Sequence, residues 1–143
     1  MMGDHFRKLE NMYHAAPVNA YYNPRLEVSK GRAELTMDVN PDFFHAANAL
    51  HGSVYFKALD DAAFFAVNSL VKDLFVVTVS FNIFLLRPVT EGTLRAEGYV
   101  TSRSRTLFVA ESVLYIGKDR QAARGSGSFM RSSIPLAEVK AYA

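Results

Sequence analysis

Two neighbouring acids inside an apolar stretch are the residues of this chain best suited to chemistry. Asp60 and Asp61 lie within residues 51–71, a stretch that from Ala58 to Val71 is apolar around nearly the whole circumference of a helix. A helix of this kind is buried on every side, and a charged side chain is rarely buried without a partner or a task. Lys57 precedes Asp61 by four residues, so these two side chains can pair on one helix face. Asp60 is then either a structural acid at a solvated edge or a general base or nucleophile.

The start of the same helix supplies a second chemical feature. Gly52 follows His51 there, where a helix has unpaired N–H groups and a positive dipole end. Without a side chain, glycine lets a ligand approach the backbone. Asp60 lies eight residues further, about 12 Å along the axis at ~1.5 Å per residue. One carbonyl group cannot span that distance, so Gly52 of one chain meets Asp60 of another or the two do not cooperate.

The surroundings of Asp60 predict an unusual acid. Phe56 and Phe64 occupy the positions four before and four after it. Removal of a carboxylate from water disfavours its charged form. We therefore expect the pKa of Asp60 to be raised.

Three other kinds of site have weaker support. His45 and His51 lack cysteine partners, and the nearby acids are on another helix face, so we expect no metal. His51, Ser53 and Asp60 contain the residue types of a hydrolase triad, but the G-x-S-x-G elbow is missing. Residues 125–127 (GSG) lack the Lys and helix of a phosphate loop, which favours a strand packed against a close neighbour.

Size and composition favour one domain with a hydrophobic core. The chain has 143 residues, 50% of them hydrophobic, which suits a single core. A net charge of +2 does not indicate nucleic-acid binding. The absence of Cys favours the cytoplasm, and the charged N-terminus and lack of a long apolar run predict neither a signal peptide nor a membrane span. We expect one domain over residues 1–143, with an N-terminal helical segment (1–24) and a C-terminal tail (131–143).

The elements that would position these residues follow from their periodicity. Apolar residues at three- and four-residue steps predict a helix from Asp4 to about Ala16. Alternation between turn residues predicts strands over 26–29, 32–39, 74–87, 93–102, 107–116 and 121–130. Consecutive strands joined by short turns form an antiparallel sheet. These elements predict an α+β fold in which the sheet curls around one helix. One helix leaves a large face of the sheet uncovered, so we expect a partner subunit to cover it.

The strand predicted over residues 74–87 has two different faces. Thr78, Ser80 and Asn82 form a polar patch on the face of the even positions. The odd positions, which we expect to face the core, are all apolar: Phe75, Val77, Val79, Phe81, Ile83 and Leu85.

The motifs and the order of elements resemble the hotdog-fold thioesterase superfamily, and most of all its phenylacetate-degradation (PaaI-like) acyl-CoA thioesterases. The similarity covers roughly residues 25–130, and the ordered set of motifs carries it rather than any single one. The set comprises His51-Gly52, Asp60, Ala62, Ala66, Asn68-Ser69, residues 79–82 (VSFN), 86–88 (LRP), Glu91-Gly92 and 123–130 (ARGSGSFM).

The resemblance implies an enzyme that hydrolyses an acyl or aryl-acyl thioester to the free acid and coenzyme A, without a metal or organic cofactor. By position, Asp60 is the catalytic carboxylate, as general base or nucleophile, and Gly52 is the backbone donor to the thioester carbonyl. Thr78 falls where the family often has a Ser or Thr that positions the nucleophilic water. His51 shapes the loop at the start of the helix.

The implied substrate and assembly give further expectations. The phosphates of coenzyme A call for cations, and Arg103 and Arg105, with Arg124 or Arg131, are the candidates. A solvated basic turn is the alternative interpretation of these arginines. The resemblance also implies a homodimer whose pairs associate into a tetramer, with no nucleic-acid or membrane partner.

Three positions depart from the family pattern and keep a second function open. Ser53 replaces a common second Gly, His45 replaces an Asn, and Asn48 replaces a Gly. The last two favour the alternative of a non-catalytic acyl-CoA-binding hotdog protein. A dehydratase or hydratase of the same fold is disfavoured, because its pairing of a His with an acid is not evident.

Overall fold

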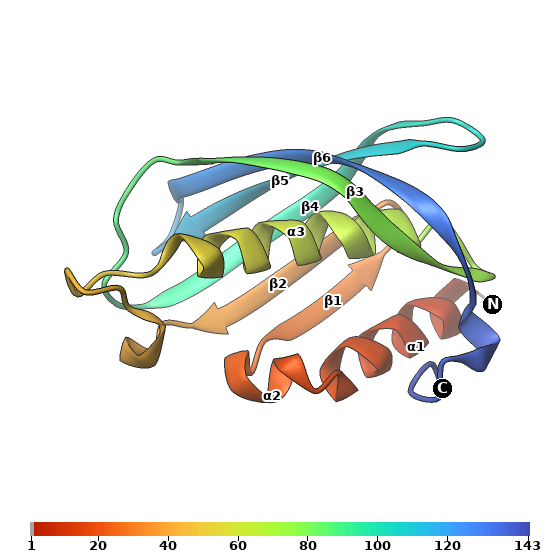
Figure 1. The fold of residues 1–143 in the computed structure, drawn as a ribbon, viewed down its shortest axis with the longest axis horizontal. Helices are drawn as coiled ribbons and strands as arrows, with labels where there is room; N and C mark the ends of the chain where they lie inside the picture. Colours follow the sequence, from red (N-terminus) through yellow and green to blue (C-terminus); the bar gives the residue numbers. More distant parts are fainter. Residues whose placement is uncertain (1) are drawn as a thin grey trace.

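Helix α3 packs along the inner face of a curved, six-stranded sheet (Figure 1). The computed structural model describes residues 2–143. Its elements in chain order are α1 (Met2–Ala15), α2 (Val18–Tyr22), β1 (Arg25–Ser29), β2 (Arg32–Asp38), η1 (Pro41–Phe43), α3 (Gly52–Asn68), β3 (Leu74–Leu85), β4 (Thr93–Arg103), β5 (Phe108–Ile116), β6 (Arg120–Pro135) and η2 (Leu136–Glu138). The predicted α+β class and the order of the long elements are confirmed.

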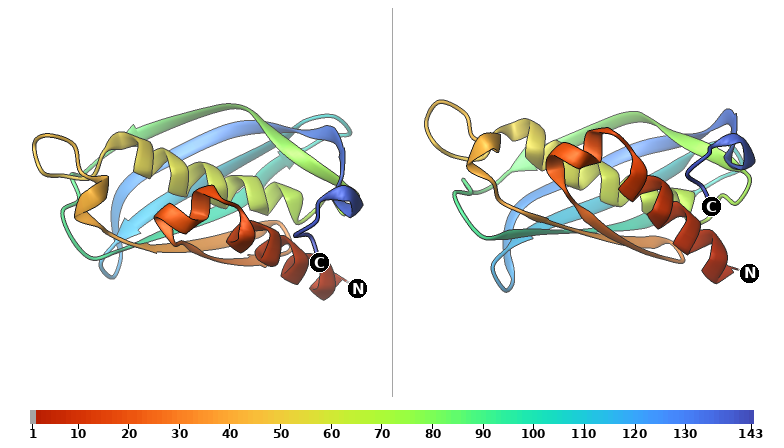
Figure 2. Two further views of the ribbon diagram at one scale, coloured as in Figure 1. Left: turned by 60° about the horizontal axis from the view of Figure 1, so that its bottom comes forward. Right: turned by 90° about the horizontal axis from the view of Figure 1, so that it is seen from below.

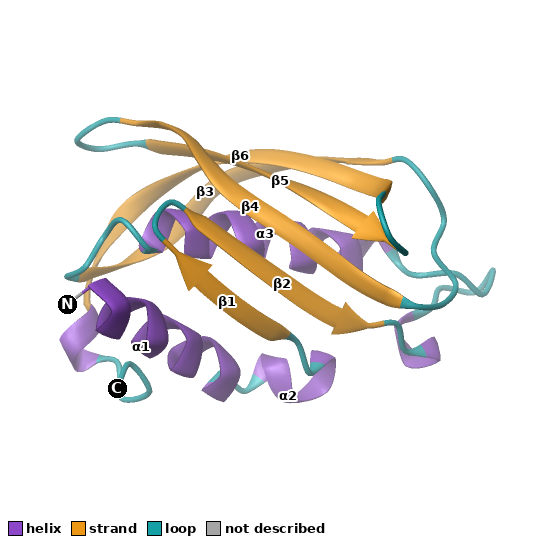
Figure 3. Cartoon of the chain, turned by 180° about the vertical axis from the view of Figure 1, so that it is seen from behind, coloured by secondary structure: helices purple, strands orange, loops and turns teal. Residues whose placement is uncertain are grey.

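The sheet has the strand order β1-β2-β4-β5-β6-β3, and every neighbouring pair is antiparallel. Figure 3 views the sheet from its outer side, with α3 behind it. Among residues 2–143, strand β3 is an edge strand that pairs with β6 only. Its other edge therefore has no partner strand in this part of the chain.

Small residues let α3 approach the sheet closely. A Cβ atom on Gly98 of β4 would lie 2.2 Å from the carbonyl oxygen of Ala62, so only glycine fits there. The buried Ser112 of β5 donates a hydrogen bond of 2.8 Å from Oγ to the carbonyl oxygen of Leu59. These contacts fix the height and rotation of α3 above the sheet.

The prediction that the odd positions of β3 face the core is confirmed for Phe75, Phe81 and Ile83, which pack against it. It is wrong for Val77, Val79 and Leu85, which are exposed. Val76 is buried, whereas Val77 and Val79 are 39% and 55% exposed. The pairing of β3 with β6 shifts between Thr78 and Ser80, which leaves Val79 as an extra residue. Such a bulge reverses the alternation of side chains along a strand. Thr78 consequently points towards α3, while Phe81 packs against the core beyond the bulge.

The glycines of residues 125–127 accommodate an aromatic ring. A Cβ atom on Gly125 or Gly127 of β6 would lie 2.5 or 2.4 Å from ring atoms of Phe81. The prediction of a strand with small residues against a close neighbour is therefore confirmed.

Helix α1 lies along the side of α3 that the sheet leaves open (Figure 2). His5 joins three parts of the chain: its Nε2 donates to the carbonyl oxygen of Asn68 (2.8 Å), and its Nδ1 accepts from the hydroxyl of Tyr142 (2.6 Å). Strand β6 continues to Pro135, so residues 131–135 belong to the sheet rather than to the expected tail. None of the helices in residues 2–143 is long and apolar enough to cross a membrane.

Candidate active site

Asp60 projects from the middle of α3 into a pocket of about 260 Å³. Its Oδ1 accepts a hydrogen bond of 2.9 Å from the hydroxyl of Thr78 on β3. Apolar side chains form most of the remaining wall, among them Phe64 and Phe75. The second carboxylate oxygen of Asp60 has no hydrogen-bond partner within residues 2–143, so it is available to a ligand or a water molecule.

Burial raises the pKa of Asp60 from 3.8 to about 6. The negative charge of Asp61 adds to this increase, whereas the hydrogen bond from Thr78 and the positive charge of Lys57 oppose it. Desolvation is the largest cause, which is the direction that the aromatic surroundings predicted. Near neutral pH the carboxylate is therefore ionised and also a stronger base than an ordinary aspartate.

Asp61 has different partners from its neighbour. Its Oδ2 lies 2.7 Å from Nζ of Lys57, which confirms the predicted pair. The same oxygen accepts a hydrogen bond of 2.7 Å from the hydroxyl of Tyr13 on α1. Burial and the adjacent carboxylate raise the pKa of Tyr13, so its hydroxyl remains a donor. Both acids line the pocket, but Asp61 is held by Lys57 and Tyr13, whereas Asp60 keeps one carboxylate oxygen without a partner within residues 2–143.

His51 caps the start of α3. Its Nδ1 accepts from the backbone N–H of Ser53 (3.0 Å) and lies 2.8 Å from the Ser53 hydroxyl. The N–H of Gly52 finds no acceptor within residues 2–143. A Cβ atom on Gly52 would lie 3.5 Å from Leu85 of β3, an ordinary contact. A free donor therefore stands at the positive end of the helix dipole.

Two of the sequence departures, His45 and Asn48, have structural roles in the loop before α3. Asn48 adopts a φ of 65°, a left-handed conformation in which Asn is the usual substitute for Gly. The Nδ1 atom of His45 accepts a hydrogen bond of 3.0 Å from the backbone N–H of Ala47. The backbone N–H of His45 donates to the carbonyl oxygen of Ala49. Both replacements therefore support the local fold of this loop.

The candidate arginines lie at two ends of the sheet. Arg131 donates to the carbonyl oxygen of Arg105 (2.6 Å) and lies over the ring of Phe108, which is the cross-strand partner of Arg103. Phe129 on β6 pairs with Phe108, and Arg124 precedes it by five residues, or about 16 Å at ~3.3 Å per residue. One chain therefore brings Arg103, Arg105 and Arg131 together and leaves Arg124 apart.

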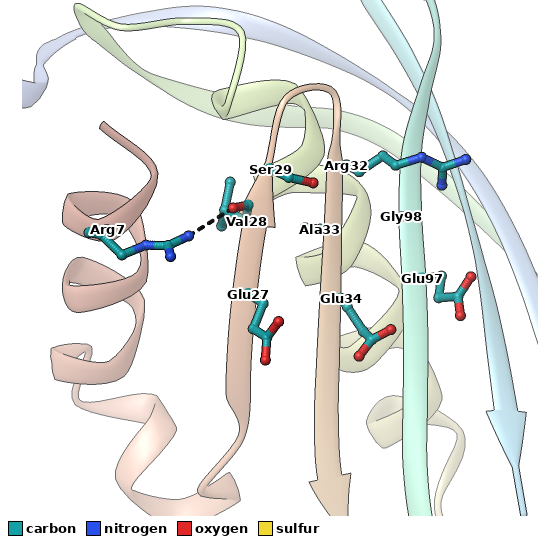
Figure 4. Close-up of a pocket in the computed structure, with 9 residues that line it drawn as sticks. All are labelled: Arg7, Glu27, Val28, Ser29, Arg32, Ala33, Glu34, Glu97 and Gly98. Carbon is teal, nitrogen blue, oxygen red and sulfur yellow. Dashed lines mark hydrogen bonds between the residues drawn. The ribbon is translucent and has the colours of Figure 1, made fainter. Parts of the chain in front are cut away.

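A second hollow, of about 290 Å³, lies on the outer face of the sheet (Figure 4). Glu27, Glu34 and Glu97 stand directly opposite one another on β1, β2 and β4. At its border Arg7 donates to the carbonyl oxygen of Val28 (3.0 Å). Neighbouring carboxylates repel anionic ligands, and α3 lies behind this face, so we do not assign the active site to it.

Sequence reasoning missed the residues that α1 and α2 contribute to the pocket. Tyr13 and Asn19 lie far from Asp60 in the sequence, and no local motif connects them. The charged pair Lys57–Asp61 was the one available sign that other segments contribute to the pocket. A buried ion pair needs further hydrogen-bond partners, and these can come from a distant part of the sequence. Residues 2–143 contain no group of three or more His, Cys, Asp or Glu side chains arranged to hold a metal.

The fold and this site define an α+β protein in which the central helix of a wrapped sheet carries a carboxylate that faces a pocket. Residues 47–123 match the family model of the thioesterase superfamily, and the chain belongs to this superfamily. "Putative esterase SSO1253" of Saccharolobus solfataricus is 31% identical over 104 residues, which are 73% of this chain and 69% of the relative.

Solved structures confirm the hotdog fold. The PaaI protein of E. coli, from the phenylacetic acid degradation operon, has a TM-score of 0.84 and 21% identity, with coverage of 93% of this chain and 96% of the other. A thioesterase family protein of Silicibacter pomeroyi has a TM-score of 0.81 and 28% identity, with coverage of 88% and 96%. Membership of the superfamily supports hydrolysis of acyl thioesters as the general class of reaction.

Proposed function

We propose that this protein is an acyl-CoA thioesterase that hydrolyses an acyl or aryl-acyl thioester to the free acid and coenzyme A. The observation that carries the proposal is the placement of Asp60, which is ionisable near neutral pH, beside Thr78 in an apolar pocket. Thioester hydrolysis needs a base or nucleophile at the carbonyl carbon and a donor at its oxygen. Asp60 supplies the first and the free N–H of Gly52 the second.

Two routes use the same groups. As a general base, the Asp60 carboxylate removes a proton from a water molecule whose oxygen attacks the thioester carbonyl. The tetrahedral intermediate then breaks its C–S bond, and the departing thiolate takes up the proton. As a nucleophile, it forms an anhydride and expels the thiolate, and water then cleaves the anhydride. Thr78 donates to Oδ1 in both routes and so holds the carboxylate with its other oxygen towards the substrate.

The donor and the acid come from different subunits in this proposal. Gly52 and Asp60 are on the same α3, about 12 Å apart along its axis. The free edge of β3 supports a second copy as the partner, because an unpaired edge with apolar side chains invites pairing. The exposed apolar residues of this edge and its continuation are Val77, Val79, Phe84, Leu85 and Leu86.

Such a dimer would also bring Arg124 of one chain close to Arg103 and Arg105 of the other. If the two copies of β3 pair in antiparallel fashion, the Arg124 end of one sheet lies beside the Arg103 and Arg105 end of the other. We propose that these cations bind the phosphates of coenzyme A. Two dimers would then form the tetramer, and the enzyme would act in the cytoplasm.

Release of free thiol from a panel of acyl-CoAs tests the activity. Wild type should hydrolyse at least one member, and Asp60→Asn should lose about 10²- to 10⁴-fold in rate. Hydrolysis unchanged in Asp60→Asn would refute the assigned mechanism. Binding of acyl-CoA without turnover by wild type would identify a non-catalytic binding protein instead.

Mixed dimers test the shared site. Gly52→Pro removes the N–H at a helix position that tolerates proline, and Gly52→Ala, which keeps the N–H, is the matched control. Asp60→Asn and Gly52→Pro should each be inactive. After denaturation and refolding together, about a quarter of the wild-type activity should return, because half the dimers then contain one intact site. No return of activity would contradict a site shared between subunits.

A further inference from the structure

Helices α1 and α2 form one wall of the pocket around Asp60. The opposite walls come from α3 and β3 (Figure 2 shows α1 against α3). The residues contributed by the N-terminal segment are Met12, Tyr13, Ala16, Val18 and Asn19. Met12 and Tyr13 are buried, and the ring of Tyr13 packs edge-on against Phe65 with centroids 5.1 Å apart. The wall is thus part of the packed structure beside the proposed catalytic acid.

A polar network ties this wall to α3. Lys57 lies 2.7 Å from Asp61 and donates a hydrogen bond of 2.6 Å to the side-chain oxygen of Asn19 on α2. Asn19 in turn donates to the carbonyl oxygen of Tyr13 (2.7 Å). The ammonium group of Lys57 also lies over the rings of Tyr13 and Tyr22, at 5.2 and 5.3 Å from their centroids. Since charged groups this far from water need such partners, the network holds α1 and α2 at a fixed distance from Asp60.

The wall limits the space next to the acid. An apolar cavity of about 150 Å³ holds a benzene molecule. In proportion, the pocket of about 260 Å³ accommodates about ten carbon atoms. A long fatty-acyl chain would exceed it, whereas a short, branched or aryl acyl group would fit.

We propose that Met12, Ala16 and Val18 determine the size of the acyl group that this enzyme accepts. The inference rests on the proposed function, since it assigns the acyl group of the substrate to this pocket. Ala16 is the most informative position, because a larger side chain there would enter the pocket from the wall. Tyr13 and Asn19 act as positioning residues, because they orient the wall without a required contact to the acyl group.

Acyl-chain profiles test the proposal. We would measure kcat/KM by thiol release for acyl-CoAs of two to sixteen carbons and for benzoyl- and phenylacetyl-CoA. Ala16→Phe should lower kcat/KM for the largest accepted acyl group by about tenfold or more relative to kcat/KM for acetyl-CoA. Met12→Ala should shift the preference towards longer chains. Ala15→Phe is the matched control, since Ala15 is exposed and outside the pocket, and it should keep the wild-type profile.

The outcomes separate this proposal from the proposed function. If wild type hydrolyses thioesters but neither Ala16→Phe nor Met12→Ala alters the chain-length profile, the wall proposal is overturned and the function stands. If wild type hydrolyses none of the thioesters, calorimetric titration of the same acyl-CoAs into the same variants measures their binding affinities. These affinities then test whether the wall residues select the acyl group by size. A change in the dependence of affinity on acyl size between wild type and the variants would support the proposed role of the wall. The same dependence in all of them would refute it. Thermal unfolding of each variant excludes a loss caused by misfolding.

Discussion

Thr78 reaches Asp60 because β3 contains one extra residue directly after it. The hydroxyl of Thr78 donates to Oδ1 of Asp60 at 2.9 Å. The bulge at Val79 lies between Thr78, which points inward, and the residues of the second half of the strand that also point inward. A regular strand could not place Thr78 and Phe81 on the same face, since side chains alternate with a period of two. The bulge is therefore the structural feature that gives the acid its hydrogen-bond partner.

Removal of the Thr78 hydroxyl should change the acidity of Asp60. This hydrogen bond lowers the pKa of the carboxyl group, so Thr78→Ala should move the acid limb of the kcat/KM profile to higher pH and reduce the rate at pH 7 by about tenfold. Thr78→Ser keeps a hydroxyl and is the control that should stay close to wild type. An acid limb at the same pH in Thr78→Ala would show that the bond does not act on Asp60.

The pH dependence of the wild type should report the raised pKa. Asp60 acts in its ionised form, so kcat/KM should fall below an apparent pKa of about 6 rather than about 4. An acyl-pantetheine thioester is the suitable substrate, because it lacks the phosphate groups that titrate in the same range. A plateau that continues down to pH 5 would contradict the assignment.

Replacement of the acid should stabilise the fold at neutral pH. The folded state holds a proton on Asp60 up to about pH 6, whereas the unfolded chain releases it near 3.8. The free energy of unfolding contributed by this group therefore falls as the pH rises through that window. Asp60→Asn should gain up to about 3 kcal/mol over wild type at pH 8. At pH 3.5 the two should differ little in urea denaturation, and an equal gain at both values would exclude titration as the cause.

The Lys57–Asp61 pair should stabilise the wall of the pocket. Both side chains are mostly buried, at 14% and 17% exposure. Lys57→Met leaves the Asp61 charge without its cation and should lower the free energy of unfolding by about 3 kcal/mol or more. It should also raise the pKa of Asp60, because Lys57 lowers that pKa in the wild type. The double variant Lys57→Met/Asp61→Asn should recover most of the stability, and its failure to do so would point to lost packing instead.

Gly98 should not tolerate any side chain. The Cβ of Gly98→Ala would overlap the backbone of α3 at Ala62, so chemical denaturation should show a loss of about 3 kcal/mol or more. Gly3→Ala is the control: its Cβ meets nothing within 4 Å, and alanine favours the helix by about 0.5–1 kcal/mol. Equal stability of the two variants would refute the close approach.

The local features of this protein were determined by its sequence. The period of apolar residues placed α3 and the long strands, because helix and strand periods depend on neighbours in the chain. The four-residue spacing of Lys57 and Asp61 predicted their ion pair, and the apolar neighbours of Asp60 predicted its raised pKa. The ordered motifs predicted the hotdog fold and the thioesterase superfamily.

Only the tertiary structure decided which face of β3 turns towards α3. Leu74 and Val76 are as apolar as Phe75 and Val77, and pattern alone could not reveal an extra residue at Val79. It also brought Tyr13 and Asn19 to the acid and placed Arg124 away from Arg103. These relationships depend on strand register and on packing between distant segments. Residue spacing along the chain does not encode either of them, since each depends on which surfaces bury one another best.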